Sequence, residues 1–113
     1  MSETNDHVMQ ADFEASGSIY PKVTADQIDA LMNDVIYKTN VVDGTTTTLA
    51  VAVLPIGAVN FTLAIELTAC VDPRNFNAEK GAMYAVEKAK TSARNKLWEL
   101  EGYSLAKEIA GEL

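Results

Sequence analysis

The chain has 113 residues, of which 48% are hydrophobic and 22% are charged, and its formal net charge is −7 at pH 7. This composition excludes a disordered chain and indicates one globular domain with a modest core. The negative charge argues against non-specific binding to duplex nucleic acid, which needs many contacts between basic side chains and phosphates. No membrane span is expected, because Asn60 and Glu66 interrupt the apolar part of the chain.

The first 23 residues are polar, and Gly17 stands between two serines within them. Because this segment shows no sustained periodicity, we predict that residues 1–23 form a flexible arm and that residues 24–113 form a single α-β-β-α domain. Residues 24–27 match a capping box, in which the Thr24 hydroxyl accepts from a free backbone N–H group. The apolar residues that follow recur at helical spacing, which predicts a first helix over about residues 25–38.

The central part of the chain changes from helical to alternating periodicity after the Asp43-Gly44 turn. Apolar residues alternate with threonine and alanine over residues 45–54, and a second alternating run covers residues 61–68. We predict that these runs pair as a two-stranded antiparallel hairpin. Because such a hairpin is marginal in water, it is expected to pack on the helices and to have its edges covered by another subunit.

A turn at Asp72-Pro73 precedes a long helix that is predicted to run from about residue 78 to residue 101. Gly102 is expected to close this helix, and residues 103–109 are expected to form a short terminal helix. One stripe of the long helix consists mainly of small apolar residues and is the predicted core face. The fold class is therefore α+β, and we expect the chain to be oligomeric.

The opposite side of the long helix carries Tyr84 and Trp98, with Arg94 beside them. A solvated helix face does not normally hold tryptophan, whereas aromatic residues and arginine dominate contacts between molecules. Two interpretations remain open for this side of the helix. It meets a partner or a ligand, or another part of the same chain covers it.

The segment from Thr68 to Leu105 carries the pattern Cys-Val-Asp-Pro, then Asn-Phe, a helical Gly81, and Trp-Glu-Leu-Glu-Gly-Tyr. This pattern resembles the small phage proteins typified by gene product 66 of phage Sf6. The resemblance covers under half of the chain. It implies a phage source, and hence the cytoplasm of the infected bacterial host, but it assigns no chemistry.

Catalytic and metal-binding residues are scarce in this sequence. His7 is the only histidine and lies in the predicted arm, so a Ser-His-Asp or Cys-His mechanism has no credible base. Cys70 is the only cysteine, and together with one histidine it does not make a structural zinc site. We therefore expect no enzyme, no metal and no cofactor, and binding remains as the predicted function.

Two binding functions fit these observations. In the first, an oligomer sequesters a small anionic nucleotide that signals host defence, as a counter-defence sponge. An arginine contacts phosphate, an aromatic ring stacks on a base and an asparagine reads its edge. In the second, the acidic protein inhibits a host defence protein or mimics nucleic acid. The predicted ligand-binding residues are Arg74, Asn75, Phe76, Tyr84, Arg94, Asn95 and Trp98.

Overall fold

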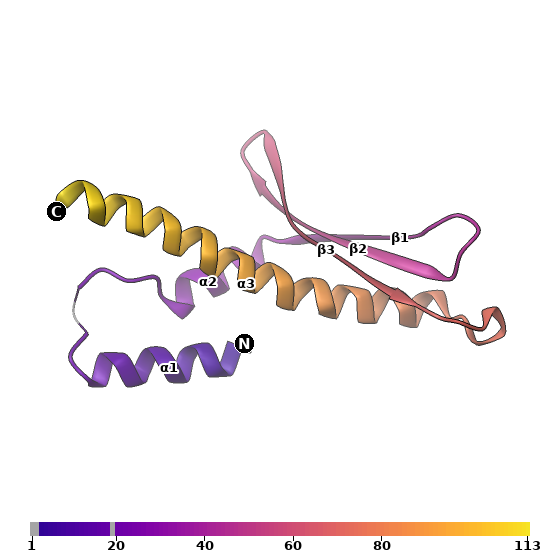
Figure 1. Cartoon of the computed structure of the whole chain (residues 1–113), viewed down its shortest axis with the longest axis horizontal. Helices are drawn as coiled ribbons and strands as arrows, with labels where there is room; N and C mark the ends of the chain where they lie inside the picture. Colours follow the sequence, from indigo (N-terminus) through magenta and orange to yellow (C-terminus); the bar gives the residue numbers. More distant parts are fainter. Residues whose placement is uncertain (1–2, 19) are drawn as a thin grey trace.

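The computed structural model describes residues 3–18 and 20–113 and has an α+β fold organised around one long helix (Figure 1). A three-stranded sheet lies along the first half of this helix, the second helix of the chain lies near its middle, and the first helix lies on the side of its second half. In chain order the elements are α1 (Glu3–Ala15), α2 (Ala25–Asn33), β1 (Ile36–Val41), β2 (Thr47–Ile56), β3 (Val59–Ala69), a 3-10 turn (Pro73–Asn75) and α3 (Ala78–Glu112).

The sheet has the strand order β1-β2-β3, and both pairs of strands are antiparallel. The predicted hairpin corresponds to β2 and β3, which confirms its antiparallel pairing. The two-stranded count is wrong, because β1 adds a third strand at the free edge of β2. Alternate residues of the central strand are buried against α3, and these are Thr48, Ala50, Ala52 and Leu54.

Small side chains on both surfaces let α3 approach the sheet closely. Ala85, Ala89 and Ala93 of α3 are fully buried. A Cβ atom on Gly81 would lie 2.9 Å from Oγ1 of Thr48, so this part of the helix has no room for a side chain. The predicted core face of α3 therefore packs on a sheet whose own inner residues are also mostly small.

Two predicted boundaries of helices are wrong. Helix α2 ends at Asn33, and the residues expected to complete it enter β1 at Ile36 instead. Helix α3 continues through Gly102 to Glu112, so the separate terminal helix does not exist. Gly102 is permitted inside the helix because glycine only weakens a helix interior, by about 1 kcal/mol relative to alanine.

Helix α1 lies in the segment for which the sequence predicts a flexible arm. Residues 3–15 are helical, and side chains from this helix contact both α2 and α3. Exposed apolar side chains remain on α1 at Val8 and Phe13, so much of its surface is not packed. Its attachment to the rest of the chain is mainly polar.

Side-chain caps begin the later elements, and the predicted cap at Thr24 is confirmed. The Thr24 side chain accepts from the backbone N–H of Gln27, and the Asn77 side chain accepts from that of Lys80. Asp72 accepts from the backbone N–H of Arg74 at the start of the 3-10 turn. No helix in the described part of the chain is long and apolar enough to cross a membrane.

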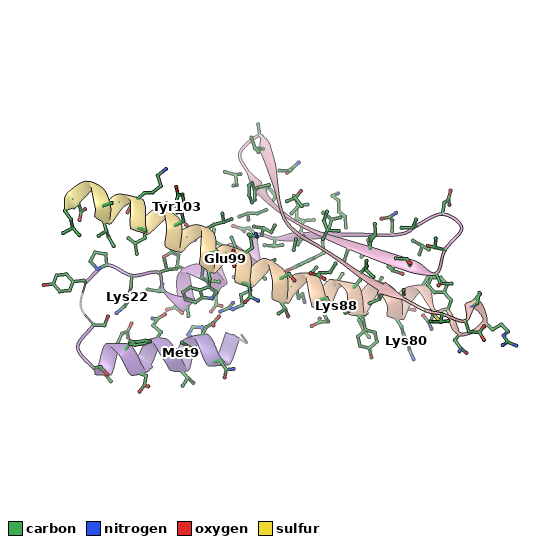
Figure 2. All side chains as sticks on the ribbon, in the orientation of Figure 1. Met9, Lys22, Lys80, Lys88, Glu99 and Tyr103 are labelled. Carbon is green, nitrogen blue, oxygen red and sulfur yellow. The ribbon has the colours of Figure 1, made fainter. Side chains whose placement is uncertain are left out.

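Two apolar surfaces have no cover within the described chain. The sheet face that points away from α3 exposes Ile36, Ile65 and Leu67, which are 48%, 60% and 50% exposed. The second half of α3 extends beyond the sheet, where Figure 2 shows Tyr103 projecting from the helix. Exposed apolar surfaces of this kind commonly mark contacts with another chain.

Candidate functional site

One carboxylate of α1 joins the two residues of α3 that carry the predicted ligand site. Oδ2 of Asp6 accepts from Nε of Arg94 at 2.6 Å and from Nε1 of Trp98 at 2.9 Å. Arg94 and Trp98 are one helical turn apart, so their side chains lie on the same side of α3. Asp6 and Arg94 are both buried. The two predicted donors therefore converge on one anion, which the protein itself supplies.

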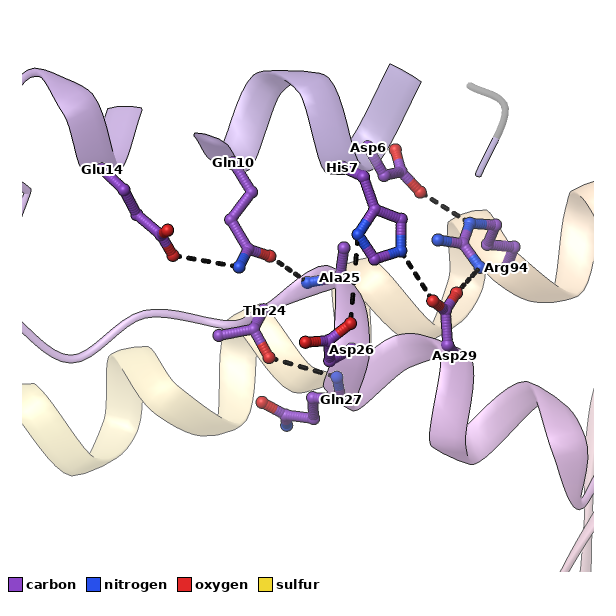
Figure 3. A network of polar contacts seen from close by, with 10 residues as sticks. All are labelled: Asp6, His7, Gln10, Glu14, Thr24, Ala25, Asp26, Gln27, Asp29 and Arg94. Carbon is purple, nitrogen blue, oxygen red and sulfur yellow. Dashed lines mark hydrogen bonds and ion pairs between the residues drawn. The ribbon is translucent and has the colours of Figure 1, made fainter. Parts of the chain in front are cut away.

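Arg94 also binds a carboxylate of α2, so one guanidinium ties three helices together (Figure 3). Its Nη1 donates to Oδ1 of Asp29 at 2.8 Å. Burial lowers the pKa of Arg94, but the hydrogen bonds to Asp29 and Asp6 outweigh this effect and raise the pKa above its usual value. Arg94 is therefore a permanent cation in a buried position.

The ring of His7 lies between two carboxylates of α2 (Figure 3). Nε2 donates to Oδ2 of Asp29 at 2.7 Å, and Nδ1 lies 3.9 Å from Oδ1 of Asp26. Hydrogen bonds from His7 and then Arg94 hold the pKa of Asp29 below its usual value, although burial acts in the opposite direction. Asp29 is thus an ionised link between α1 and α3.

Two buried polar atoms in this network have no hydrogen-bond partner among the described residues. They are Oδ1 of Asp6 and Nη2 of Arg94. Buried polar groups are normally paired, because an unpaired donor or acceptor loses its hydrogen bonds to water. The pairing of Asp6 with Arg94 therefore leaves Nη2 of Arg94 without an acceptor and Oδ1 of Asp6 without a donor among the described residues.

A cavity of about 330 Å³ lies beside this network, between α1, the segment that leads to α2, and α3. Its walls are largely apolar, with Trp98 on one side and Phe13 on another, while Lys22 supplies a positive charge. In Figure 2, Met9 lies on α1 and Lys22 lies on the segment between α1 and α2. The volume is at the lower end of the range for small-molecule sites, which starts near ~300 Å³. The lining residues are Asp6, Met9, Gln10, Phe13, Ser18, Lys22, Val23 and Trp98.

Comparison with known proteins identifies the family of the chain. The model of the phage protein family called N4 Gp49/phage Sf6 gene 66 matches residues 23–109, which is more than half of the sequence. The chain belongs to this family. No curated protein and no solved structure matches it.

The match to the Gp49/gene 66 family starts at residue 23 and leaves α1 outside. Arg94 and Trp98 therefore lie in the part that matches the family, whereas Asp6 and His7 lie in the part that does not. The buried network is thus a contact between the matched region and a helix that precedes it.

The other predicted ligand residues of this Gp49/gene 66 protein do not join Arg94 and Trp98. Asn75, Phe76 and Tyr84 line a second cavity, of about 240 Å³, at the start of α3. Lys80 lies at the same cavity, and Figure 2 shows its place in the first half of the helix. Of the predicted residues, Trp98 thus lines the first cavity, whereas Asn75, Phe76 and Tyr84 line the second.

Arg74, Arg94 and Asn95 line neither cavity, and only Arg94 belongs to the buried network. Asn95 is exposed on α3, and the Arg74 side chain is 89% exposed. The Arg74 guanidinium binds the Asp72 carboxylate at 2.7 Å, which lowers the pKa of Asp72 and raises that of Arg74. Arg74 is therefore already paired with an acid close to it in the sequence.

None of the contributions of α1 to the site was predicted from the sequence. A signal was present, because Asp6, Met9, Gln10 and Phe13 lie at spacings of three, four and seven residues and line one cavity. This is the spacing of one helix face. It was obscured because the residues are a mixture of polar and apolar types, so that the hydrophobic pattern alone does not indicate a helix.

Proposed function

We propose that this phage protein is a non-enzymatic accessory protein that counters host defence by sequestering a small anionic, cyclic nucleotide. It acts as an oligomer in the cytoplasm of the infected bacterium. The observation that carries the proposal is the convergence of Arg94 and Trp98 on the Asp6 carboxylate, because donors arranged around one carboxylate also suit a phosphate.

The ligand phosphate takes the place of the Asp6 carboxylate. Nε of Arg94 and Nε1 of Trp98 then donate to phosphate oxygens, and the unpaired Nη2 of Arg94 gains an acceptor. A phosphate offers more oxygen atoms than a carboxylate, so one of them can accept from Nη2. Lys22, at the neighbouring cavity, adds a second positive charge near the ligand.

The base occupies the cavity beside the phosphate. Trp98 and Phe13 line this cavity, and stacking of a base on an aromatic ring contributes about 1–3 kcal/mol. Helix α1 must shift for Asp6 to leave, and its exposed apolar side chains indicate that little packing opposes this movement. The site does not share the negative excess of the whole protein once Asp6 has left, because Arg94 and Lys22 then balance Asp29 and Glu14.

The oligomer is expected to form through the apolar surfaces that the described chain leaves uncovered. The open sheet face presents Ile36, Ile65 and Leu67, and the edge of β3 has unpaired backbone groups. Exposed edges of this kind are usually covered or paired. A second copy of the chain meets this need, and light scattering at micromolar concentration would detect it.

Isothermal calorimetry tests the nucleotide proposal directly. Cyclic dinucleotides, cyclic trinucleotides and cyclic ADP-ribose derivatives are titrated into the protein at ~50 μM, which registers dissociation constants of about 10 μM. At least one ligand is expected to release heat. Trp98→Phe should weaken its binding because the ring remains while the Nε1 donor is lost. Lys96→Gln is the matched control, since it removes a half-exposed charge from α3 outside both cavities.

A Tyr84→Ala variant identifies which of the two cavities binds the ligand. Binding that is lost with Tyr84→Ala and kept with Trp98→Phe would place the site at the start of α3. Absence of heat with every nucleotide would contradict the proposal as a whole.

An acidic inhibitor of a host defence protein, or a nucleic-acid mimic, is the second candidate function. The observation that favours it is the exposed apolar sheet face of a protein that carries 16 acidic and 9 basic residues. Exposed apolar patches commonly mark protein–protein interfaces. Binding to a purified host factor, reduced by Ile65→Asp on the open sheet face, would support this function over nucleotide binding.

A further inference from the structure

A histidine and two aspartates gather where α1 meets the beginning of α2. One ligand atom from each of His7, Asp26 and Asp29 can be chosen so that all three atoms lie within 4.8 Å of one another. Imidazole nitrogen and carboxylate oxygen are common ligands of divalent first-row transition metals. This cluster lies outside the two cavities described above.

The orientation of His7 suits a metal ligand. Its Nε2 donates to Asp29, so in the neutral ring the lone pair belongs to Nδ1, which is directed toward the Asp26 carboxylate (Figure 3). A carboxylate that accepts from the far nitrogen of a metal-binding histidine is a frequent arrangement, because it fixes the tautomer and the direction of the ring. Asp29 is itself held by Arg94, which fixes the carboxylate in turn.

The separation between His7 and Asp26 also fits an ion. Nδ1 lies 3.9 Å from Oδ1 of Asp26, which is too long for a direct hydrogen bond. A zinc ion binds nitrogen at about 2.0–2.1 Å and carboxylate oxygen at about 2.0–2.2 Å in a tetrahedral arrangement, which places the two ligand atoms about 3.4 Å apart. A small rotation of the exposed Asp26 side chain brings both atoms within reach of one ion. Asp26 is largely exposed, which leaves the remaining coordination positions to water.

We propose that His7 and Asp26 bind a divalent transition metal ion of the Zn²⁺ class, with Asp29 as the residue that positions the histidine. The ion joins α1 to α2 across the segment between them. It therefore holds α1 in the position that places Asp6 against Arg94. The sequence does not indicate this metal site, because Asp26 and Asp29 lie 19 and 22 positions after His7 in the chain.

Calorimetry with zinc chloride on the full chain tests this site. The wild-type protein at ~50 μM is expected to bind Zn²⁺ with a dissociation constant in the micromolar range, which this concentration registers. Mg²⁺ should bind far more weakly, since it prefers oxygen ligands and retains its waters. Zinc binding should weaken as the pH falls, because protons compete with the ion for its ligand atoms.

Two variants and one control make the test specific. His7→Gln removes the nitrogen ligand, and Asp26→Asn removes a charged ligand on an exposed side chain without disturbing buried packing. Both are expected to reduce zinc affinity at least tenfold. Asp12→Asn removes a carboxylate from the exposed surface of α1 and should bind zinc as the wild type does. Circular dichroism at the titration temperature verifies that each variant is folded.

Two outcomes would overturn the metal site. One is an absence of zinc binding by the folded wild-type protein. The other is unchanged binding in both His7→Gln and Asp26→Asn, because the ion would then occupy other surface carboxylates. Neither outcome affects the nucleotide proposal, which rests on Arg94 and Trp98.

Discussion

Arg94 binds Asp6 through a 2.6 Å ion pair that joins residues 88 positions apart in the sequence. The pair is buried, and Trp98 donates to the same carboxylate oxygen. These two bonds join α1 to α3. Both the stability of the α1 interface and the proposed ligand site depend on them.

Replacement of Arg94 by methionine is expected to destabilise the protein by about 3–5 kcal/mol, because Asp6 is left as an uncompensated buried charge. Urea denaturation measures this loss. The double variant Asp6→Leu with Arg94→Met should lose less stability than the sum of the two single variants. Strict additivity in this cycle would mean that the two side chains do not interact in solution.

Deletion of residues 1–21 should leave the sheet and α3 folded, since the match to the Gp49/gene 66 family starts only at residue 23. Trp98 is the only tryptophan and loses the cover of α1 in this variant. Its fluorescence emission should therefore shift to longer wavelength. An unshifted spectrum would show that α1 does not cover Trp98 in solution.

A pair of glycines on α3 should respond in opposite directions to substitution by alanine. Gly81→Ala places a Cβ atom 2.9 Å from Oγ1 of Thr48 and is expected to destabilise the protein, because the helix must move away from the sheet. Gly102→Ala meets nothing within 4 Å and should stabilise it by up to about 1 kcal/mol through helix propensity. Thermal denaturation of both variants makes the comparison, and equal effects would contradict the close packing at Gly81.

The stability of the protein should fall with acidification, partly through Asp29. Its pKa is lowered in the folded protein, so Asp29 stabilises the fold above its unfolded pKa of about 3.9, and this contribution is lost as the pH falls through the lower folded value. Asp29→Asn should therefore flatten the decline in stability below about pH 4. Denaturation curves of both proteins between pH 7 and pH 2 measure the difference. If the stability of both proteins falls in parallel, Asp29 does not contribute to the loss of stability in acid.

Local signals in the sequence predicted much of the fold. Thr24 was identified as a cap because its side-chain acceptor satisfies a backbone donor three residues later. The β2–β3 hairpin was predicted from alternating residues on either side of a turn. These features depend on contacts between near neighbours in the sequence, which a pattern can reveal.

The errors arose where distant contacts determine local structure. Val35 and Ile36 continue the helical spacing of α2, yet Ile36 enters β1 because that segment pairs with β2. Gly102 was expected to end a helix, but nothing in the structure requires the chain to turn there. Arg94 and Trp98 were predicted as a pair from their spacing, whereas Asp6 and Asp29 meet them only through the tertiary fold.

The proposed nucleotide site requires that Asp6 occupy an anion site formed by Arg94 and Trp98. A titration of the Asp6→Ala variant with the same cyclic nucleotides, followed by the fluorescence of Trp98, tests it most directly. Because the competing carboxylate is absent, the variant should bind at least one nucleotide about tenfold more tightly than the wild type, a gain of about 1.4 kcal/mol. A folded Asp6→Ala protein whose Trp98 fluorescence responds to none of these nucleotides would contradict the claim.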